Sequence, residues 1–176
     1  MRQQNNWYAI SGVASSGKTT IINLLEQKGY KVLHESATEF VLNQIKKGFS
    51  IEDLRKNESV FQETIFQLKI FYESLLDPNE TVFIDRGLPD SIAFWKLYNL
   101  PMKSDIENAI KNSSYKKVFL FERLPLVKEE FRPEPEEEIS IMDKYNKEAY
   151  ENLGHNIVNV PVMSVENRLK FVLENI

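Results

Sequence analysis

An octapeptide near the start of the chain has the residue types that bind phosphate. Residues 12–19, called the phosphate loop below, read Gly-Val-Ala-Ser-Ser-Gly-Lys-Thr and match G-x-x-x-x-G-K-[ST] between an expected strand and an expected helix. The glycines let the backbone curl so that successive N–H groups point at phosphate oxygens, and the helix start adds its positive dipole end. The lysine then reaches the β- and γ-phosphates. We expect ATP to be bound here by Gly12, Ala14, Ser15, Ser16, Gly17, Lys18 and Thr19, with Thr20 as a neighbour of the contacting residues.

Two oxygen donors are placed to hold Mg²⁺ beside the nucleotide. The hydroxyl of Thr19 is the group that ligates Mg²⁺ in this motif, and the ion prefers oxygen ligands. Asp85 follows the apolar run 81–84, so it should lie at the carboxyl end of a strand, on the same sheet edge as the phosphate loop. We expect Thr19 and Asp85 to arrange the metal; the alternative for Asp85 is a solvated acid at a strand end.

The residues that flank this aspartate favour transfer to a substrate over hydrolysis. Water-splitting ATPases commonly carry a second carboxylate beside the aspartate, whereas Arg86 follows here. A cation suits an anionic substrate or the charge that develops on the transferred group. Glu35 lies just beyond the apolar run 30–34 and is a candidate base for a substrate hydroxyl, or simply a polar strand end. Asp90 is expected to cap the next helix, and a contact with the substrate is the alternative.

Arginines and aromatic side chains further along are candidates for a lid and a substrate wall. Arg123 and Arg132 bracket a segment rich in proline and glutamate, and arginines on such a mobile lid, near 123–140, often close over phosphates. Both could equally be ordinary surface arginines. No role is expected for His34 or His155. One helical stripe could stack on a planar base, but core packing is favoured for Phe61, Gln62, Phe66 and Gln67.

The elements that must position these groups alternate along the chain. Short apolar runs typical of strands occupy residues 7–11, 30–34, 81–84, 117–121 and 157–160. Apolar spacing of three and four predicts helices between them, at 21–29, 61–75, 141–153 and 165–172, with Ser104 and Glu107 as a possible capping box. Strand and helix alternate without a linker. This predicts one α/β domain over residues 1–176, with a mostly parallel sheet, helices on both faces and ligands at the strands' carboxyl ends.

Length and composition limit the class of protein. The chain of 176 residues suits one domain with one site, and its 42% hydrophobic and 27% charged residues are an ordinary globular profile. A net charge of −4 gives no nucleic-acid footprint, and the lack of cysteine excludes a disulfide, a thiolate zinc site and a cysteine nucleophile. No apolar stretch approaches the roughly 20 residues that span a bilayer. We expect a soluble, cytoplasmic protein without nucleic-acid or membrane partners.

These motifs resemble those of a known family over nearly the whole chain. The chain is similar to the kinase-like P-loop proteins known as an AAA domain or predicted ATPase family, which are related to nicotinamide-riboside, thymidylate and deoxynucleoside kinases. The resemblance is carried by residues 12–20, 29–35, 83–87 with Asp90, 132–134, 153–161 and 164–168. It implies a P-loop NTPase three-layer sandwich with a five-stranded parallel sheet of order 2-3-1-4-5.

The resemblance also implies roles for particular residues. It assigns phosphate binding to the phosphate loop and a metal or substrate role to Asp85 and Arg86. It assigns a lid role to Arg132, and it places residues 161–164, beginning with Pro161, at the border of the adenine.

Comparison with two of the related kinases bears on the acceptor. In deoxynucleoside kinases, a glutamate after the second strand is the base and a Phe-Gln pair reads the nucleobase, which would correspond to Glu35 and to Phe61 with Gln62. Thymidylate kinases have a Glu-Pro pair after that strand, whereas Ser36 follows Glu35 here. This departure counts against a nucleoside monophosphate as acceptor.

The leading interpretation is a kinase that transfers the γ-phosphoryl group of ATP, with Mg²⁺, to a nucleoside- or nucleotide-like small molecule. The alternative is an ATP-binding regulatory module or a slow ATPase without an acceptor, and product formation separates the two. A GTPase switch is disfavoured because residues 146–149, Asn-Lys-Glu-Ala, lack the aspartate of the Asn-Lys-x-Asp element that reads guanine. A motor ATPase is least favoured, because the chain has no room for the helical lid of that class.

Overall fold

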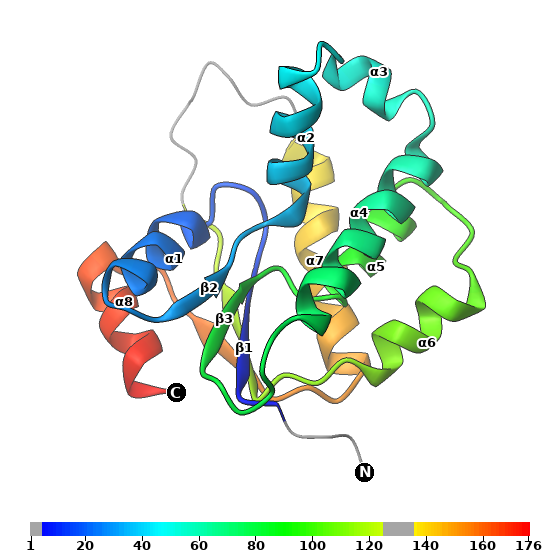
Figure 1. Cartoon of the computed structure of the whole chain (residues 1–176). Helices are drawn as coiled ribbons and strands as arrows, with labels where there is room; N and C mark the ends of the chain where they lie inside the picture. Colours follow the sequence, from blue (N-terminus) through cyan, green and yellow to red (C-terminus); the bar gives the residue numbers. More distant parts are fainter. Residues whose placement is uncertain (1–4, 125–135) are drawn as a thin grey trace.

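The strands form one parallel sheet. The structure is a computed structural model that describes residues 5–124 and 136–176. The sheet in these residues has five strands: β1 (Trp7–Ser11), β2 (Lys31–Leu33), β3 (Val82–Asp85), β4 (Lys117–Phe121) and β5 (Ile157–Val160). Their order is β2-β3-β1-β4-β5 (Figure 1), and every neighbouring pair is parallel. The predicted order and direction of the sheet are therefore confirmed.

Helices cover both faces of this sheet. The described helices are α1 (Lys18–Gln27), α2 (Ser36–Lys46), α3 (Ile51–Arg55), α4 (Glu58–Ser74), α5 (Asp90–Leu97), α6 (Ser104–Asn112), α7 (Glu136–Asn152) and α8 (Val165–Glu174). Figure 1 shows α1 and α8 on one face, α4 to α7 on the other, and α2 with α3 extending beyond the carboxyl ends of the strands. None of the helices in the described ranges is long and apolar enough to cross a bilayer.

The core lies in two layers, one on each side of the sheet. Successive side chains of a strand point to opposite faces. Tyr8 and Ile10 of β1 accordingly pack with Ile22 of α1 and Val172 of α8. Trp7 and Ala9 belong to the opposite layer, which also contains Tyr115 and Tyr150. Because strands buried on both faces have no polar side, they read as continuous apolar runs in the sequence.

Some boundaries and one helix cap differ from the expectation. β2 is two residues shorter than the run 30–34, and β3 begins one residue later than expected and includes Asp85. The capping box of Ser104 and Glu107 is wrong, because α6 has Lys103 as its N-cap and no side-chain cap. Ser104 already lies inside the first turn, so its hydroxyl does not occupy the capping position. The capping box that the structure contains belongs to α3, between Ser50 and Asp53.

Candidate functional site

The phosphate loop connects β1 to α1 and packs tightly against β4. Gly12 has a φ of +135°, and a Cβ atom there would lie 2.7 Å from the carbonyl oxygen of Phe121, so only glycine fits without displacing backbone. Ser16 is buried, and its hydroxyl donates to the carbonyl of Val13 at 2.9 Å, which closes the loop from inside. Ala14 and Ser15 are exposed. The loop is thus fixed from behind and open in front, as a phosphate cradle requires.

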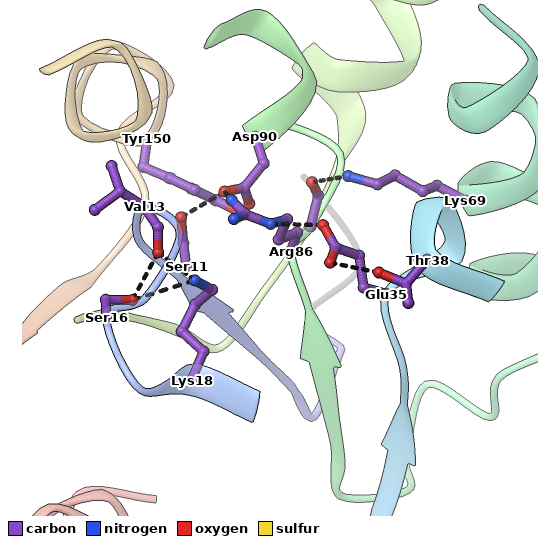
Figure 2. A network of polar contacts seen from close by, with 11 residues as sticks. Ser11, Val13, Ser16, Lys18, Glu35, Thr38, Lys69, Arg86, Asp90 and Tyr150 are labelled. Carbon is purple, nitrogen blue, oxygen red and sulfur yellow. Dashed lines mark hydrogen bonds and ion pairs between the residues drawn. The ribbon is translucent and has the colours of Figure 1, made fainter. Parts of the chain in front are cut away.

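Lys18 points back into this loop. Its ammonium group is buried and donates to the carbonyl of Val13 at 2.6 Å and to the hydroxyl of Ser16 at 3.1 Å (Figure 2). Burial, followed by the positive charge of Arg86, lowers the pKa of Lys18 to about 7, against the opposing effect of Asp85. A desolvated cation whose hydrogen bonds within residues 5–124 and 136–176 end on uncharged oxygens gains from an incoming phosphate.

Thr19, Glu35 and Asp85 line one cavity of about 540 Å³, called the Asp85 cavity below. Asp85 is 6% exposed, and its Oδ1 atom is buried without a hydrogen-bond partner in the described part of the chain. Burial, followed by the charge of Glu35, raises the pKa of Asp85 to about 6. Such a carboxylate gains from a cation in the cavity. His34, for which no role was expected, also lines this cavity.

The fit to Mg²⁺ depends on oxygens from outside the protein. Over residues 5–124 and 136–176, no group of three or more histidine and acidic side chains is arranged to hold a metal ion. Mg²⁺ usually keeps several waters and binds through one or two protein oxygens plus substrate phosphates. The hydroxyl of the exposed Thr19 and the unpartnered Oδ1 of Asp85 fit that pattern, with phosphate oxygens completing the coordination.

Arg86 links the two carboxylates on either side of β3. It follows the strand with a φ of +64°, a strained conformation for a non-glycine residue and one that is concentrated at functional sites. Its Nε atom lies 2.8 Å from Oε1 of Glu35, and Nη1 lies 3.6 Å from Oδ1 of Asp90 (Figure 2). Burial acts to lower the pKa of Arg86. The charges of Glu35, Asp90 and Asp85 together outweigh burial and raise this pKa above its usual value.

Glu35 stays ionised in this setting. Burial acts to raise its pKa, but Arg86, then Lys69 and Lys18, outweigh burial and hold the pKa below its usual value. The side chain is 29% exposed, and its Oε2 atom accepts a hydrogen bond from the hydroxyl of Thr38 at 3.1 Å. Glu35 is therefore an accessible, charged carboxylate at the start of α2.

Asp90 does not cap α5, so the expected role is wrong. Pro89 is the N-cap, and Asp90 is the first helical residue with no exposure. Its Oδ1 atom accepts from the hydroxyl of Ser11 at 2.6 Å, and its Oδ2 atom accepts from the hydroxyl of Tyr150. Asp90 therefore makes hydrogen bonds to residues far away in the sequence instead of capping the helix, and no local sequence pattern shows such partners. Asp90 ties Arg86 to β1 and α7.

A second layer of buried polar groups supports the turn after β3. Lys69 of α4 donates to the carbonyl of Gly87 at 3.3 Å, and the backbone N–H of Leu88 donates to the hydroxyl oxygen of Tyr115 at 2.8 Å. Tyr115 in turn donates to Glu73 at 2.8 Å. Sequence reasoning missed Lys69 and Glu73. Their signal was two charged residues four apart on the apolar face of a helix.

Glu73 makes stability depend on pH. Burial raises its pKa to about 7, against the hydrogen bond from Tyr115 and the charge of Lys69. A raised carboxyl pKa means that the folded chain binds the proton more tightly, so this contribution is full below about pH 4.5 and is lost as pH rises through 7. The free energy of unfolding of Glu73→Gln, measured relative to wild type, should therefore rise by about 1–3 kcal/mol between pH 5 and pH 8.

Urea unfolding at both pH values measures this difference. The control is Glu107→Gln at an exposed position, which keeps Glu73 and should therefore show the same pH dependence as wild type. Equal pH dependence in Glu73→Gln and wild type would show that Glu73 is ionised in the folded chain over this range.

Two further cavities are both lined by Glu35 and Arg86. The Gln62 cavity, of about 100 Å³, is walled by Phe61, Gln62 and Phe94, with Lys69 and Arg55 among its other residues. The Tyr98 cavity, of about 240 Å³, runs from the phosphate loop past Tyr98 to Ile139 and Met142 of α7. Glu35 also lines the Asp85 cavity. Its carboxylate is therefore common to all three spaces.

The four residues of the helical stripe, Phe61, Gln62, Phe66 and Gln67, lie in different environments. Phe66 is fully buried against Trp95 in a core cluster, as expected for packing. Gln67 is exposed, so core packing is wrong for it. Phe61 is half-buried and Gln62 is buried, and both face the Gln62 cavity.

Gln62 belongs to a polar group at the rim of its cavity. Its amide donates to Glu58 at 2.8 Å. The guanidinium of Arg55 pairs with Glu58 at 3.0 Å and donates to the hydroxyl of Tyr98 at 2.6 Å. The ring of Tyr98 also lies under Arg55, 5.3 Å from the guanidinium carbon. Arg55 and Tyr98 were not identified from the sequence, because nothing local distinguishes them from surface residues.

The other candidate residues that the structure describes are not among those that line these three cavities. Arg123 is half-buried and acts to lower the pKa of Asp143, which burial raises. The carbonyl of Pro161 accepts from Arg168 at 2.9 Å. His155 packs against the rings of Tyr115 and Tyr150. Arg132 and residues 125–135 of the expected lid lie outside the described residues, and the exposed Thr20 lies in the first turn of α1.

Solved structures that resemble this one include nucleoside and nucleotide kinases. Deoxyadenosine kinase from M. mycoides with bound dCTP is 19% identical, with a TM-score of 0.67 over 96% of this chain and 97% of that chain. Thymidylate kinase from Ehrlichia chaffeensis is 15% identical, with a TM-score of 0.64 over 98% of each chain. NadR in complex with NR is 17% identical at a TM-score of 0.69, over 98% of this chain but 50% of that chain. At these identities the likeness establishes the fold.

The family follows from the extent of a sequence match rather than from these structures. No curated protein matches the chain significantly. A family model described as "AAA domain" matches residues 7–168, from the start of β1 through the phosphate loop and the Asp85–Arg86 turn to α8. Since this match covers the whole sheet and every described residue that lines the Asp85 cavity, the chain belongs to the AAA domain family and is a kinase-like P-loop domain.

Proposed function

We propose that this protein is a kinase that transfers the γ-phosphoryl group of ATP to a hydroxyl group of a nucleoside-like small molecule. The observation that carries the proposal is the position of Glu35. Glu35 lines the Asp85 cavity together with Thr19 and Asp85, and it also lines the two cavities walled by aromatic side chains, of which the Tyr98 cavity reaches the phosphate loop. A group between nucleotide and acceptor is where a base for phosphoryl transfer has to lie.

The nucleotide side of the site is supplied by the phosphate loop. Backbone N–H groups and Lys18 bind the phosphates, and the ammonium group exchanges its bond to the Val13 carbonyl for the charged oxygens. Bound Mg²⁺ supplies charge neutralisation on the β- and γ-phosphates and orients them. Thr19 and Asp85 are the residues that would hold the ion.

The acceptor side uses Glu35 and Arg86. Glu35 orients the substrate hydroxyl and accepts its proton as the bond to phosphorus forms. Because transition states of phosphoryl transfer are mostly loose, little proton transfer is needed early, and a carboxylate of low pKa is adequate. Arg86 stabilises charge on the transferred group and holds Glu35 in place at 2.8 Å. Lid roles for Arg132 and Arg123 remain part of the proposal.

A nucleoside-like acceptor is supported by two features. Phe61, Phe94 and Gln62 offer rings and an amide beside Glu35, which suits a planar base. The similar structures include a kinase named for a nucleoside, deoxyadenosine, and NadR in complex with NR.

The test is release of ADP from ATP·Mg²⁺ with and without nucleosides, nucleoside monophosphates, nicotinamide riboside and other hydroxylated metabolites. We expect one class of nucleoside to stimulate ADP release and to appear as a phosphorylated product, and Lys18→Ala to abolish both. Lys18→Ala is the control because its ammonium group is the charged donor in the phosphate loop. Slow turnover that no acceptor changes, or binding without turnover, would instead support a regulatory nucleotide-binding module.

A further inference from the structure

A buried arginine of the last helix contacts the phosphate loop from behind. Arg168 is 3% exposed, and its Nη1 group donates to the carbonyl of Ser16 at 2.5 Å. The same guanidinium donates through Nη2 to the carbonyl of Glu122 at 3.1 Å and through Nε to the carbonyl of Pro161 at 2.9 Å. One side chain therefore joins the phosphate loop to the backbone just after β4 and just after β5.

The bond to Ser16 sets the direction of the next N–H group. A peptide unit is planar, and in the trans form its C=O and N–H point in opposite directions. All described peptides of the chain are trans. Holding the Ser16 carbonyl against Arg168 therefore turns the N–H of Gly17 away from Arg168. That N–H is one of the donors that the phosphate loop offers to a phosphate oxygen.

Gly17 is shaped to accept this contact. A Cβ atom on Gly17 would lie 3.2 Å from Nη1 of Arg168, closer than most such contacts, and the residue has a φ of +85°. The glycine thus serves two purposes: it adopts the left-handed conformation that starts α1, and it leaves room for the guanidinium.

The charge of Arg168 is also available to the loop. Its three hydrogen bonds within the described residues all end on uncharged carbonyl oxygens, and the guanidinium carbon lies 5.4 Å from the centre of the Phe121 ring. Carbonyl oxygens and an aromatic face stabilise a buried cation without neutralising it. Positive charge therefore remains behind the loop that binds phosphate, offset in part by the carboxylate of Glu122.

We propose that Arg168 is a positioning residue for the nucleotide, which orients the Ser16–Gly17 peptide toward the phosphates and adds positive potential behind it. The inference rests on the proposed ATP-binding function and extends it to α8. Arg168 does not touch the substrate; it acts through the backbone of the phosphate loop.

The test compares affinities for Mg²⁺-bound ATP and Mg²⁺-bound tripolyphosphate in wild type, Arg168→Ala and Arg168→Lys. Lys170→Ala is the matched control, because it removes a positive charge from the same helix, and Lys170 is an exposed residue that pairs with Glu174 at 3.7 Å. Arg168→Ala should weaken both probes by about tenfold or more, since a charge-assisted hydrogen bond and a charge are lost. Lys170→Ala should change either affinity by less than about twofold, since an exposed charge is screened by solvent.

Two further experiments distinguish a positioning role of Arg168 from an effect on the stability of the fold. Arg168→Lys keeps the charge but has no planar fork for three carbonyls, so we expect an intermediate affinity. Should Arg168→Ala not fold, as shown by circular dichroism, the lysine variant carries the same comparison. Millimolar guanidinium chloride should restore part of the ATP affinity of Arg168→Ala, and equal sodium chloride should not.

The outcomes distinguish the two proposals. If wild type binds neither probe, the ATP-binding function fails and the inference fails with it. If wild type binds both and the Arg168 variants bind them equally well, only the inference fails. A loss for ATP without a loss for tripolyphosphate would also overturn it, because Arg168 would then act through Pro161 and not through the phosphates.

Discussion

Replacing Glu35 by glutamine is expected to lower kcat, measured with the acceptor that stimulates ADP release, by about 10²- to 10⁴-fold. This is the range for loss of a general base. The affinity for ATP·Mg²⁺ should stay within about twofold, because the carboxylate lies outside the phosphate loop. Steady-state kinetics with the acceptor and calorimetric titration of ATP measure the two effects. A large fall in kcat with an unchanged nucleotide affinity is the signature of a group that acts on the acceptor.

The physical reason is the charge and position of this carboxylate. Glutamine has nearly the same shape and keeps an oxygen that can accept from Thr38, but it cannot accept a proton. It also leaves Arg86 facing an amide instead of a charge at 2.8 Å. The substrate hydroxyl then loses the partner that orients it and removes its proton.

The matched control is Glu39→Gln. Glu39 is an exposed carboxylate of the same helix and lines the same Asp85 cavity, so the substitution removes an equal charge from the same region. It should leave kcat within about threefold, since an exposed charge is screened by solvent. Equal losses in the two variants would mean that the site responds to net charge, and Glu35 would no longer be the candidate base.

The contact between Glu35 and Arg86 was within reach of the sequence once the strand order was assumed. In the order 2-3-1-4-5, β2 lies beside β3, and their register pairs Leu33 with Ile84. Glu35 and Arg86 each lie two residues beyond those partners. Parallel strands end at the same edge of a sheet, so the two side chains meet there. The central strands β1, β3 and β4 were predictable because strands buried on both faces are continuous apolar runs.

Other parts of the site depend on partners that sequence spacing does not show. Asp90 follows a proline at a helix start, where the local pattern indicates a cap, but its partners Ser11 and Tyr150 are 79 and 60 residues away. Lys69 and Glu73 interrupt an apolar stripe, yet the turn that they support comes from the loop after β3. Only the packing of α4 and α7 against that loop makes these polar residues necessary.

The helices α2 and α3 were not predicted, for a related reason. Leu42 and Ile45 of α2 and Ile51 of α3 are exposed, so their apolar residues do not mark a buried stripe. These helices extend beyond the strands and pack little against the sheet (Figure 1). Their role in the site is to place Glu35, at the N-cap of α2, and Arg55, the last residue of α3.

Arg86→Met is expected to lower the free energy of unfolding by about 3–5 kcal/mol, the range for removing one partner of a buried ion pair. The side chain of Arg86 is 10% exposed and that of Asp90 has no exposure, so the carboxylate of Asp90 would stay buried without the guanidinium of Arg86. Hydrogen bonds from Ser11 and Tyr150 stabilise that charge only in part. Urea unfolding at neutral pH measures the loss.

The control makes the same substitution at a more exposed ion pair, in which the side chain of the acidic partner is 19% exposed. Arg55 contacts Glu58 at 3.0 Å, and its side chain is 37% exposed, so Arg55→Met should cost less than about 1 kcal/mol. A second variant, Arg86→Met with Asp90→Asn, removes the stranded charge while leaving an oxygen to accept from Ser11, so it should recover part of the stability. If Arg86→Met cost no more than Arg55→Met, the pairs around Arg86 would not be desolvated. If the double variant regained stability but not turnover, the charge of Arg86 would be required for the reaction itself, beyond its part in holding Asp90.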